Sequence, residues 1–245
     1  MEQYDQLDDL QLNGWQIWQN SRFFRFGTDG VLLADFARCR PKEKYIDLCS
    51  GTGIVPFMLL ARGDAAAAEA VELQPYLCRL MERSCRQNNC EDRFKVLEGD
   101  LKEIRSLCRG GCYDLVTVNP PYEPMGRGIL GQNPHRELAR REVACTLEDV
   151  IGGAAYLLKS GGRLAMVHRV FRLPEILRTM ENYHLTPSRI RMVEGHAGER
   201  PMVVLIEGIL HSRRELEAEP TLILHREDGG MTDELLQIYR RERKE

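Results

Sequence analysis

The sequence of 245 residues lacks the features of a secreted, membrane-spanning or zinc-binding protein. It has no run of eighteen apolar residues, and its N-terminus has no basic segment followed by an apolar one. Its eight cysteines include no C-x-x-C pair, and no histidine follows them closely. We therefore expect reduced thiols, no metal, no membrane partner and a cytoplasmic location.

A large excess of charge of one sign is also missing, because the net charge is −3. Binding to nucleic acid through charge alone is therefore disfavoured. The charge is nevertheless uneven, since residues 1–20 carry four acids and no base. Basic residues cluster further along the chain, at His135, Arg136, Arg140 and Arg141. The length and the apolar content of 43% are typical of a single α/β domain, with an N-terminal extension of about residues 1–40 packing on it.

The glycine pattern of nicotinamide-binding proteins, G-x-G-x-x-G, does not occur after the first apolar strand, because only Gly51 and Gly53 are present. The strand, the glycine turn and the following helix still allow a ligand to approach main-chain atoms. Glu72 ends the next strand, where its carboxylate can accept from both hydroxyls of a ribose. Asp100 follows a third strand, where it can recognise the amino group of an adenine. These strand ends together predict one nucleoside pocket.

A fourth strand, residues 113–118, leads into Asn119-Pro120-Pro121-Tyr122. The two prolines make the chain stiff, because each ring restricts φ and Pro121 forces Pro120 out of the helical region. The Asn119 amide oxygen and the Pro120 carbonyl can then accept hydrogen bonds from both N–H groups of a planar NH2 group, while Tyr122 stacks on a base. A purely structural explanation is that the prolines only end the strand. The nucleoside pocket upstream favours a role in binding.

With these motifs in this order, the sequence resembles the class I S-adenosylmethionine-dependent methyltransferases that carry an N-P-P-Y motif and methylate nitrogen. Residues 26–33, Asn133-Pro134 and residues 139–142 are similar to the bacterial tRNA(Val) adenine-N6-methyltransferase family. The resemblance runs from about Phe24 to the C-terminus. It implies S-adenosylmethionine as cofactor, a tRNA as substrate and no metal.

The resemblance also implies a role for each residue of the matching motifs. Catalysis would involve Asn119, Pro120, Pro121 and Tyr122. Cofactor contacts would come from Thr28, Asp47, Cys49, Ser50, Gly51, Gly53, Glu72, Leu73, Asp100, Leu101 and Asn119. Substrate contacts would come from Arg136, Arg140 and Arg141. Cys49 departs from the wider superfamily, where a third glycine is common, and because cysteine has a Cβ we expect it to keep a negative φ.

The predicted fold is a Rossmann-like sheet of seven strands, mostly parallel with one antiparallel strand, and with helices on both faces. Strands are expected at 44–48, 68–73, 94–98, 113–118, 163–168, 188–193 and 203–210, the last antiparallel, with a short edge strand at 221–225. Helices are expected at 28–39 with Thr28 as its cap, at 54–62 and 75–88, at 146–159 ending at Ser160-Gly161-Gly162, from Pro174, and at 232–240. A hairpin is expected at 15–26 around Asn20-Ser21, and a substrate-gating or plain surface loop at 123–132.

The leading hypothesis is N6-methylation of an adenosine in the anticodon loop of a tRNA, with tRNA(Val) as the expected one. Methylation of a glutamine amide in a protein, or of an rRNA base amine, is an alternative, because such nitrogens are also planar NH2 groups. A non-catalytic module that binds S-adenosylmethionine or RNA is a third possibility, and a nicotinamide enzyme a more distant one. The arginines after the N-P-P-Y motif favour a phosphate-bearing partner. The oligomeric state is not predicted.

Overall fold

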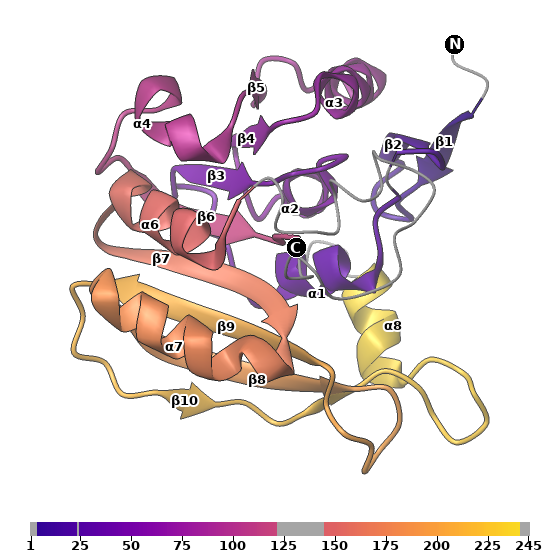
Figure 1. Cartoon of the computed structure of the whole chain (residues 1–245). Helices are drawn as coiled ribbons and strands as arrows, with labels where there is room; N and C mark the ends of the chain where they lie inside the picture. Colours follow the sequence, from indigo (N-terminus) through magenta and orange to yellow (C-terminus); the bar gives the residue numbers. More distant parts are fainter. Residues whose placement is uncertain (1–3, 24, 122–144, 241–245) are drawn as a thin grey trace.

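A nine-stranded sheet forms the centre of the molecule in the computed structural model, which describes residues 4–23, 25–121 and 145–240. Its strand order is β10-β8-β9-β7-β6-β3-β4-β5, with β11 beside β8 (Figure 1). The seven long strands are β3 (Tyr45–Leu48), β4 (Ala68–Glu72), β5 (Phe94–Glu98), β6 (Tyr113–Val118), β7 (Leu158–Arg169), β8 (Leu185–Glu194) and β9 (Val203–Leu210). Strand β9 is antiparallel to both of its neighbours, and the pairs from β5 to β7 are parallel. The predicted Rossmann-like sheet with one antiparallel strand is confirmed, and the two-residue strands β10 (Glu217–Ala218) and β11 (Leu222–Ile223) extend it.

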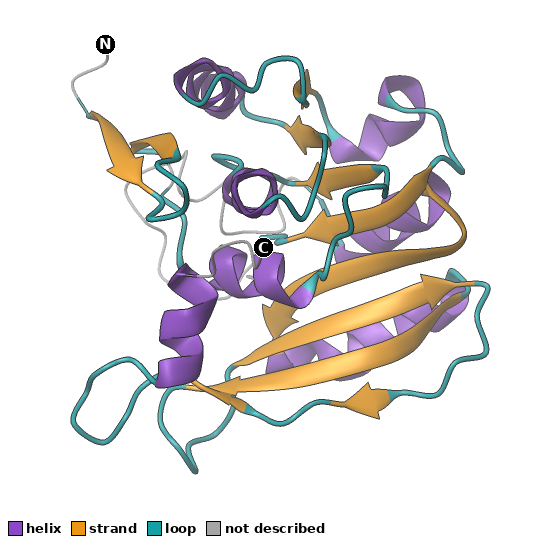
Figure 2. Ribbon diagram, turned by 180° about the vertical axis from the view of Figure 1, so that it is seen from behind, coloured by secondary structure: helices purple, strands orange, loops and turns teal. Residues whose placement is uncertain are grey.

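Helices cover both faces of the sheet (Figure 2). They are α1 (Thr28–Phe36), α2 (Ile54–Arg62), α3 (Pro75–Gln87), α4 (Ile104–Leu107), α6 (Leu147–Leu157), α7 (Leu173–Asn182) and α8 (Asp233–Arg240), with 3-10 turns η1 (Leu101–Glu103) and η2 (Val170–Arg172). Side chains of α1, α2, α3 and α8 share one apolar cluster, and those of α4, α6 and α7 share another. Strand residues alternate between the two, since Leu115 joins the first cluster while Val116 joins the second. This alternation buries both faces of the strands, as a parallel sheet requires.

The N-terminal hairpin differs from the predicted one. It pairs β1 (Asp5–Asp9) with β2 (Gln16–Asn20), so the hairpin predicted at 15–26 around Asn20-Ser21 is wrong. The turn lies at residues 10–15, where the Leu10 amide donates to the Trp15 carbonyl at 2.9 Å. Asn20 is instead used to dock the hairpin on α3, because its amide donates to the Tyr76 hydroxyl at 2.9 Å. A tertiary contact thus explains a residue that resembled a turn former.

Two predicted element boundaries are also wrong. Thr28 is not the cap of α1, because Gly27 occupies the cap position without a side-chain hydrogen bond. Strand β7 starts at Leu158 and passes through Ser160-Gly161-Gly162, which were expected to stop the preceding helix. The register between β6 and β7 shifts at this point, and Gly161 has a φ of +79°. The glycines therefore lie within β7, where they allow an irregularity, and the helix has already ended at Leu157.

Candidate active site

A cleft lies at the carboxyl ends of β3, β4, β5 and β6. It contains about 870 Å³ of space not filled by atoms, part of it open to solvent. Most of the residues predicted to bind the cofactor line it, namely Asp47, Cys49, Ser50, Gly51, Glu72, Leu73, Asp100, Leu101 and Asn119. Gly53 and Thr28 do not belong to its lining. The cleft lies at the edge of a parallel sheet where ligands of open α/β folds bind.

The turn after β3 adopts left-handed backbone at three alternate residues. The φ angles are +53° at Cys49, +61° at Gly51 and +82° at Gly53. The predicted negative φ of Cys49 is therefore wrong. Hydrogen bonds hold the turn in this shape, because the Ser50 amide donates to the Val71 carbonyl at 3.1 Å and the Gly53 amide donates to the Ser50 carbonyl at 2.9 Å. The surrounding structure thus imposes a conformation that a residue with a Cβ does not favour.

Gly53 supports the cleft from behind. A Cβ at this position would lie 3.0 Å from the Phe57 ring and 3.1 Å from the Met81 side chain. Gly53 is also the N-terminal cap residue of α2, with a left-handed φ of +82°. Glycine suits this position because it adopts that φ without strain and has no Cβ to meet Phe57 and Met81.

Asp47 occupies the floor of the cleft and is almost fully buried. Its carboxylate accepts from the Ser50 hydroxyl at 2.6 Å and from the Thr117 hydroxyl. Burial raises the pKa of Asp47 to about 7, even though both hydrogen bonds act in the opposite direction. This carboxyl group consequently changes charge near neutral pH.

Glu72 ends β4 and points its carboxylate at two main-chain amides. Oε2 accepts from the Gly51 amide at 2.8 Å, and Oε1 accepts from the Gln74 amide at 2.9 Å. Burial raises the pKa of Glu72, whereas these two amides lower it. Each carboxylate oxygen can accept more than one hydrogen bond, so the group has acceptor capacity left for a vicinal diol. The amides fix its orientation before a ligand binds.

Asp100 lies at the end of β5, on the same cleft wall. Its Oδ1 accepts from the Lys102 amide at 2.9 Å, which caps the turn η1. The Lys102 ammonium lies 3.7 Å from Oδ2, and the Asp100 side chain is 33% exposed. Asp100 is thus a second acidic side chain in the cleft, at the strand end next to that of Glu72 and beside the apolar side chain of Leu101. It can accept a hydrogen bond from an amino group of a ligand.

The end of β6 forms another wall of the cleft. Asn119 is half-buried and Pro121 is buried, and both line the cleft, while Pro120 is buried between them. Sequence reasoning missed Phe26 and Cys145, which also contribute to the lining. Cys145 brings its sulfur within 3.9 Å of the Cys49 sulfur, a contact that no sequence spacing indicated. The predicted residues outside the described part of the chain are Tyr122, Arg136, Arg140 and Arg141, together with the loop 123–132.

Comparison with known proteins identifies the family. Residues 26–186, which include the four strand ends that form the cleft, match the methyltransferase small domain. The chain belongs to this family. It is therefore an enzyme that transfers a methyl group from S-adenosylmethionine, and the family, the enzyme class and the cofactor predicted from the sequence are confirmed.

Curated relatives align over most of the chain. A protein from Porphyromonas gingivalis named tRNA1(Val) (adenine(37)-N6)-methyltransferase is 27% identical over 240 residues, which cover 94% of this chain and 93% of the relative. A protein of the same name from Aeromonas hydrophila is 27% identical over 215 residues, covering 87% and 88%. Among solved structures, a predicted O-methyltransferase from Agrobacterium tumefaciens shares the fold with a TM-score of 0.71 and 22% identity, covering 88% of this chain and 98% of that one.

The residues of the cleft fit the chemistry of the methyl donor. The fixed carboxylate of Glu72 suits the two ribose hydroxyls, and Asp100 suits the adenine amino group. Within residues 4–23, 25–121 and 145–240, no group of three His, Cys, Asp or Glu side chains could hold a metal ion. In the same part of the chain, no helix is long and apolar enough to cross a bilayer.

Proposed function

We propose that this enzyme methylates N6 of an adenosine in the anticodon loop of a tRNA, and that this tRNA is tRNA(Val). The observation that carries the proposal is the position of Asn119 and Pro121 on a wall of the cleft that also holds Glu72 and Asp100. An acceptor amine can thereby meet the bound donor in one cavity. The names of the relatives, which align over most of their own length, support the same substrate.

The donor is held by groups that the fold has already oriented. In this proposal Glu72 binds the ribose, Asp100 the adenine, and the turn from Asp47 to Gly53 the methionine part. Because the Gly51 and Gln74 amides fix the Glu72 carboxylate, little conformational freedom is lost when it binds the donor. S-adenosylmethionine supplies an electrophilic methyl carbon, so the remaining task of the chain is to orient the nitrogen and exclude water.

Asn119 and Pro120 activate the nitrogen by accepting hydrogen bonds from its two N–H groups. The lone pair of an aryl amine is delocalised into the ring, and it becomes available only as the nitrogen turns tetrahedral. The Asn119 Oδ1 atom and the Pro120 carbonyl favour this change, because they stabilise the positive charge that develops on the nitrogen. Losing one preorganised contact of this kind costs about 10²–10³ in rate. No strong base is required, since the charged product nitrogen loses its proton readily to water.

The acceptor base must leave its stack before it can enter the cleft. Enzymes that act on a base turn it out of a helix or use one that is already unpaired, and an anticodon loop meets this condition at low cost. We propose that Tyr122 stacks on the adenine, which is worth about 1–3 kcal/mol for an aromatic side chain. We further propose that Arg136, Arg140 and Arg141 contact the RNA phosphates.

The test is methyl transfer from tritium-labelled S-adenosylmethionine to tRNA from cells without the enzyme. Label is expected in N6-methyladenosine after nuclease digestion, and at one position of tRNA(Val) after purification of single tRNAs. Asn119→Ala should lower kcat by about 10²–10³ and leave the Kd of the donor unchanged. Asn182→Ala is the matched control, since Asn182 is exposed at the end of α7.

Other outcomes would redirect the assignment. Label confined to protein, after incubation with a peptide-release factor, would support methylation of a glutamine amide instead. Binding of the donor without transfer to any nucleic acid or protein would support a binding module. A Kd for the donor that rises with the loss of Asn119 would show that this residue holds the cofactor and not the acceptor.

A further inference from the structure

The chain that follows β7 lies on the same edge of the sheet as the proposed acceptor wall. Strands β6 and β7 are parallel, with Val118 beside Met166, and both point toward the same edge (Figure 1). Strand β7 continues for three residues beyond Met166 to Arg169, alongside the stretch in which β6 leads into Asn119. The turn η2 then places Phe171 just beyond this edge.

Two large apolar side chains are exposed on adjoining segments at this place. Phe171 is 59% exposed and Met202 is 69% exposed, the highest values among the large hydrophobic residues that the structure describes. They come from different segments, which are joined because the Val170 amide donates to the Met202 carbonyl at 3.1 Å and Arg169 pairs with Val203. Burial of such a side chain is worth about 1.5–3 kcal/mol, and that stabilisation is not obtained here. Two large exposed apolar side chains on adjoining segments make this edge a candidate binding surface.

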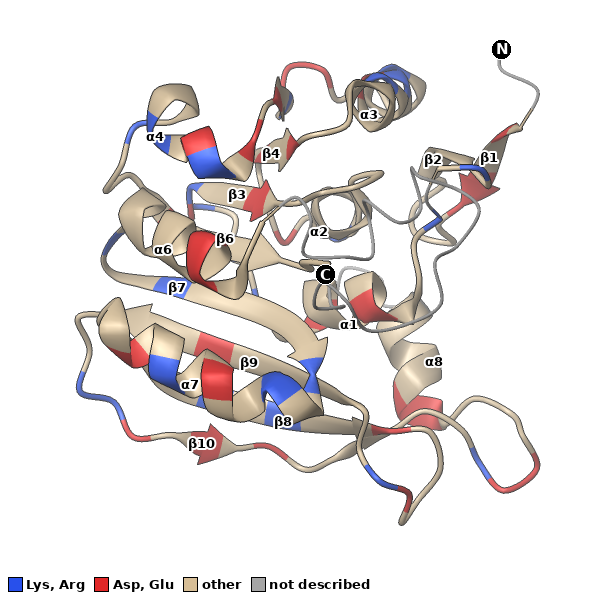
Figure 3. Ribbon diagram, viewed as in Figure 1, with Lys and Arg blue, Asp and Glu red and all other residues tan. Residues whose placement is uncertain are grey.

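Each of the two segments also carries an arginine. Arg169 precedes Phe171 by two residues, and the exposed Arg200 precedes Met202 by two residues. Figure 3 shows basic segments where β7 meets α7. Glu199, which precedes Arg200 in the sequence, accepts from the His196 amide at 2.9 Å. The surface therefore combines an aromatic ring, a thioether and the guanidinium group of the exposed Arg200.

We propose that Phe171, Met202 and Arg200 bind the nucleotides next to the methylated adenosine. This inference rests on the proposed function, because it extends the acceptor site along the RNA. Single-stranded RNA offers unstacked bases that stack on aromatic rings and phosphates that pair with arginine. An exposed Phe with an exposed arginine on the adjoining segment matches that alternation. A protein partner would use the apolar pair but would not require the guanidinium group of Arg200.

The test compares methylation kinetics of Phe171→Ala, Phe171→Trp and the wild type with tRNA as acceptor. Phe171→Ala should raise the KM for tRNA by about 5- to 100-fold, because one stacked base is lost, and should change kcat by less than about twofold. Phe171→Trp should restore the KM. Leu216→Ala is the control, since Leu216 is also 50% exposed but lies just before β10, which pairs with the middle of β8.

A second measurement tests the charged part of the surface. Arg200→Ala should lower the slope of log affinity against log salt by about 1, as expected for the loss of one phosphate contact. The exposed Arg226→Ala, in the segment before α8, should leave that slope unchanged. The Kd of S-adenosylmethionine should be the same in all these variants, which shows that each of them is folded.

The outcomes separate this proposal from the proposed function. Labelling of RNA by the wild type together with an unchanged KM in Phe171→Ala would overturn the docking surface alone. An equal rise in KM for Leu216→Ala would also overturn it, because the effect would not be local. If the wild type labels no RNA, the proposed function fails and the docking surface fails with it.

Discussion

At the scale of single residues, Cys49 stores conformational strain beside the cofactor cleft. Its φ of +53° costs about 1–2 kcal/mol for a residue with a Cβ. Glycine adopts this angle without strain, although it loses more entropy on folding. We expect Cys49→Gly to be more stable than Cys49→Ala by about 0.5–1 kcal/mol, because both lose the sulfur but only alanine keeps the strain. Urea unfolding of the two variants measures the difference, and equal midpoints would contradict it.

Asp47 couples stability to pH. Because burial raises its pKa from 3.8 to about 7, the folded state binds a proton more tightly than the unfolded state. The stability that this proton contributes is complete below about pH 4 and is lost as the pH rises through about 7. We expect the free energy of unfolding to fall between pH 5 and pH 8 by less in Asp47→Asn than in the wild type. Urea titrations at both pH values test this, with the exposed Asp92→Asn as control.

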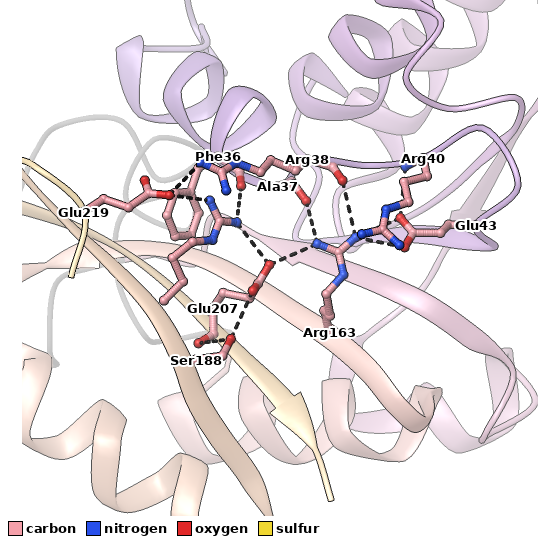
Figure 4. Close-up of polar contacts among 10 residues, drawn as sticks. Phe36, Ala37, Arg38, Arg40, Glu43, Arg163, Ser188, Glu207 and Glu219 are labelled. Carbon is pink, nitrogen blue, oxygen red and sulfur yellow. Dashed lines mark hydrogen bonds and ion pairs between the residues drawn. The ribbon is translucent and has the colours of Figure 1, made fainter. Parts of the chain in front are cut away.

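At the scale of elements, an ion network fastens the end of α1 to the antiparallel part of the sheet (Figure 4). Arg163 of β7 and Arg189 of β8 both donate to Glu207 of β9, at 3.0 and 3.1 Å. The same arginines donate to the last carbonyls of α1, those of Ala37 at 3.1 Å and Phe36 at 2.6 Å. Burial would raise the pKa of Glu207, but the two guanidinium groups hold it below its usual value. The network therefore connects four elements through one carboxylate.

Removal of that carboxylate should be costly. The Glu207 and Arg189 side chains are each 6% exposed, and Glu207→Ala removes one of the two carboxylates that pair with Arg189, the other being Glu219 at 3.1 Å. We expect a loss of about 2–3 kcal/mol in the free energy of unfolding, because a hydrogen bond to a charged group is worth about 1.5–3 kcal/mol. Glu234→Ala removes the carboxylate that pairs with Arg191, but this one is 51% exposed and its loss should cost less than about 1 kcal/mol. Denaturant unfolding of the two variants checks the contrast, and similar losses would show that the network is not the cause.

At the scale of the whole molecule, local patterns were enough to predict the parallel strands and most of the predicted residues that line the cleft. Each motif, such as the turn before Gly53 or the acid at Glu72, marks a strand end, and parallel strands bring these ends to one edge. The errors have a different origin. The φ of Cys49 is imposed by its neighbours in the fold, and the hairpin turn was misplaced because Asn20 binds Tyr76, which is far away in the sequence. Tertiary contacts of this kind leave no periodic signal in the sequence.

Binding of the cofactor connects the cleft to the stability of the whole domain. A ligand that binds only the folded state at a hundred times its Kd stabilises it by about 2.7 kcal/mol, and for a chain of this size that raises Tm by about 5–10 °C. We expect this rise for the wild type and for Asn119→Ala, since the proposed role of Asn119 is to hold the acceptor and not the donor. Glu72→Gln should show less than half of the rise at the same S-adenosylmethionine concentration, because an amide NH2 group would face the Gly51 or Gln74 amide and the diol would lose an acceptor. Thermal denaturation with and without the cofactor measures the shift for each variant.

Because each shift is taken against the same variant without ligand, a lower Tm of Glu72→Gln by itself does not affect the comparison. An undiminished shift in Glu72→Gln would place the nucleoside elsewhere in the cleft.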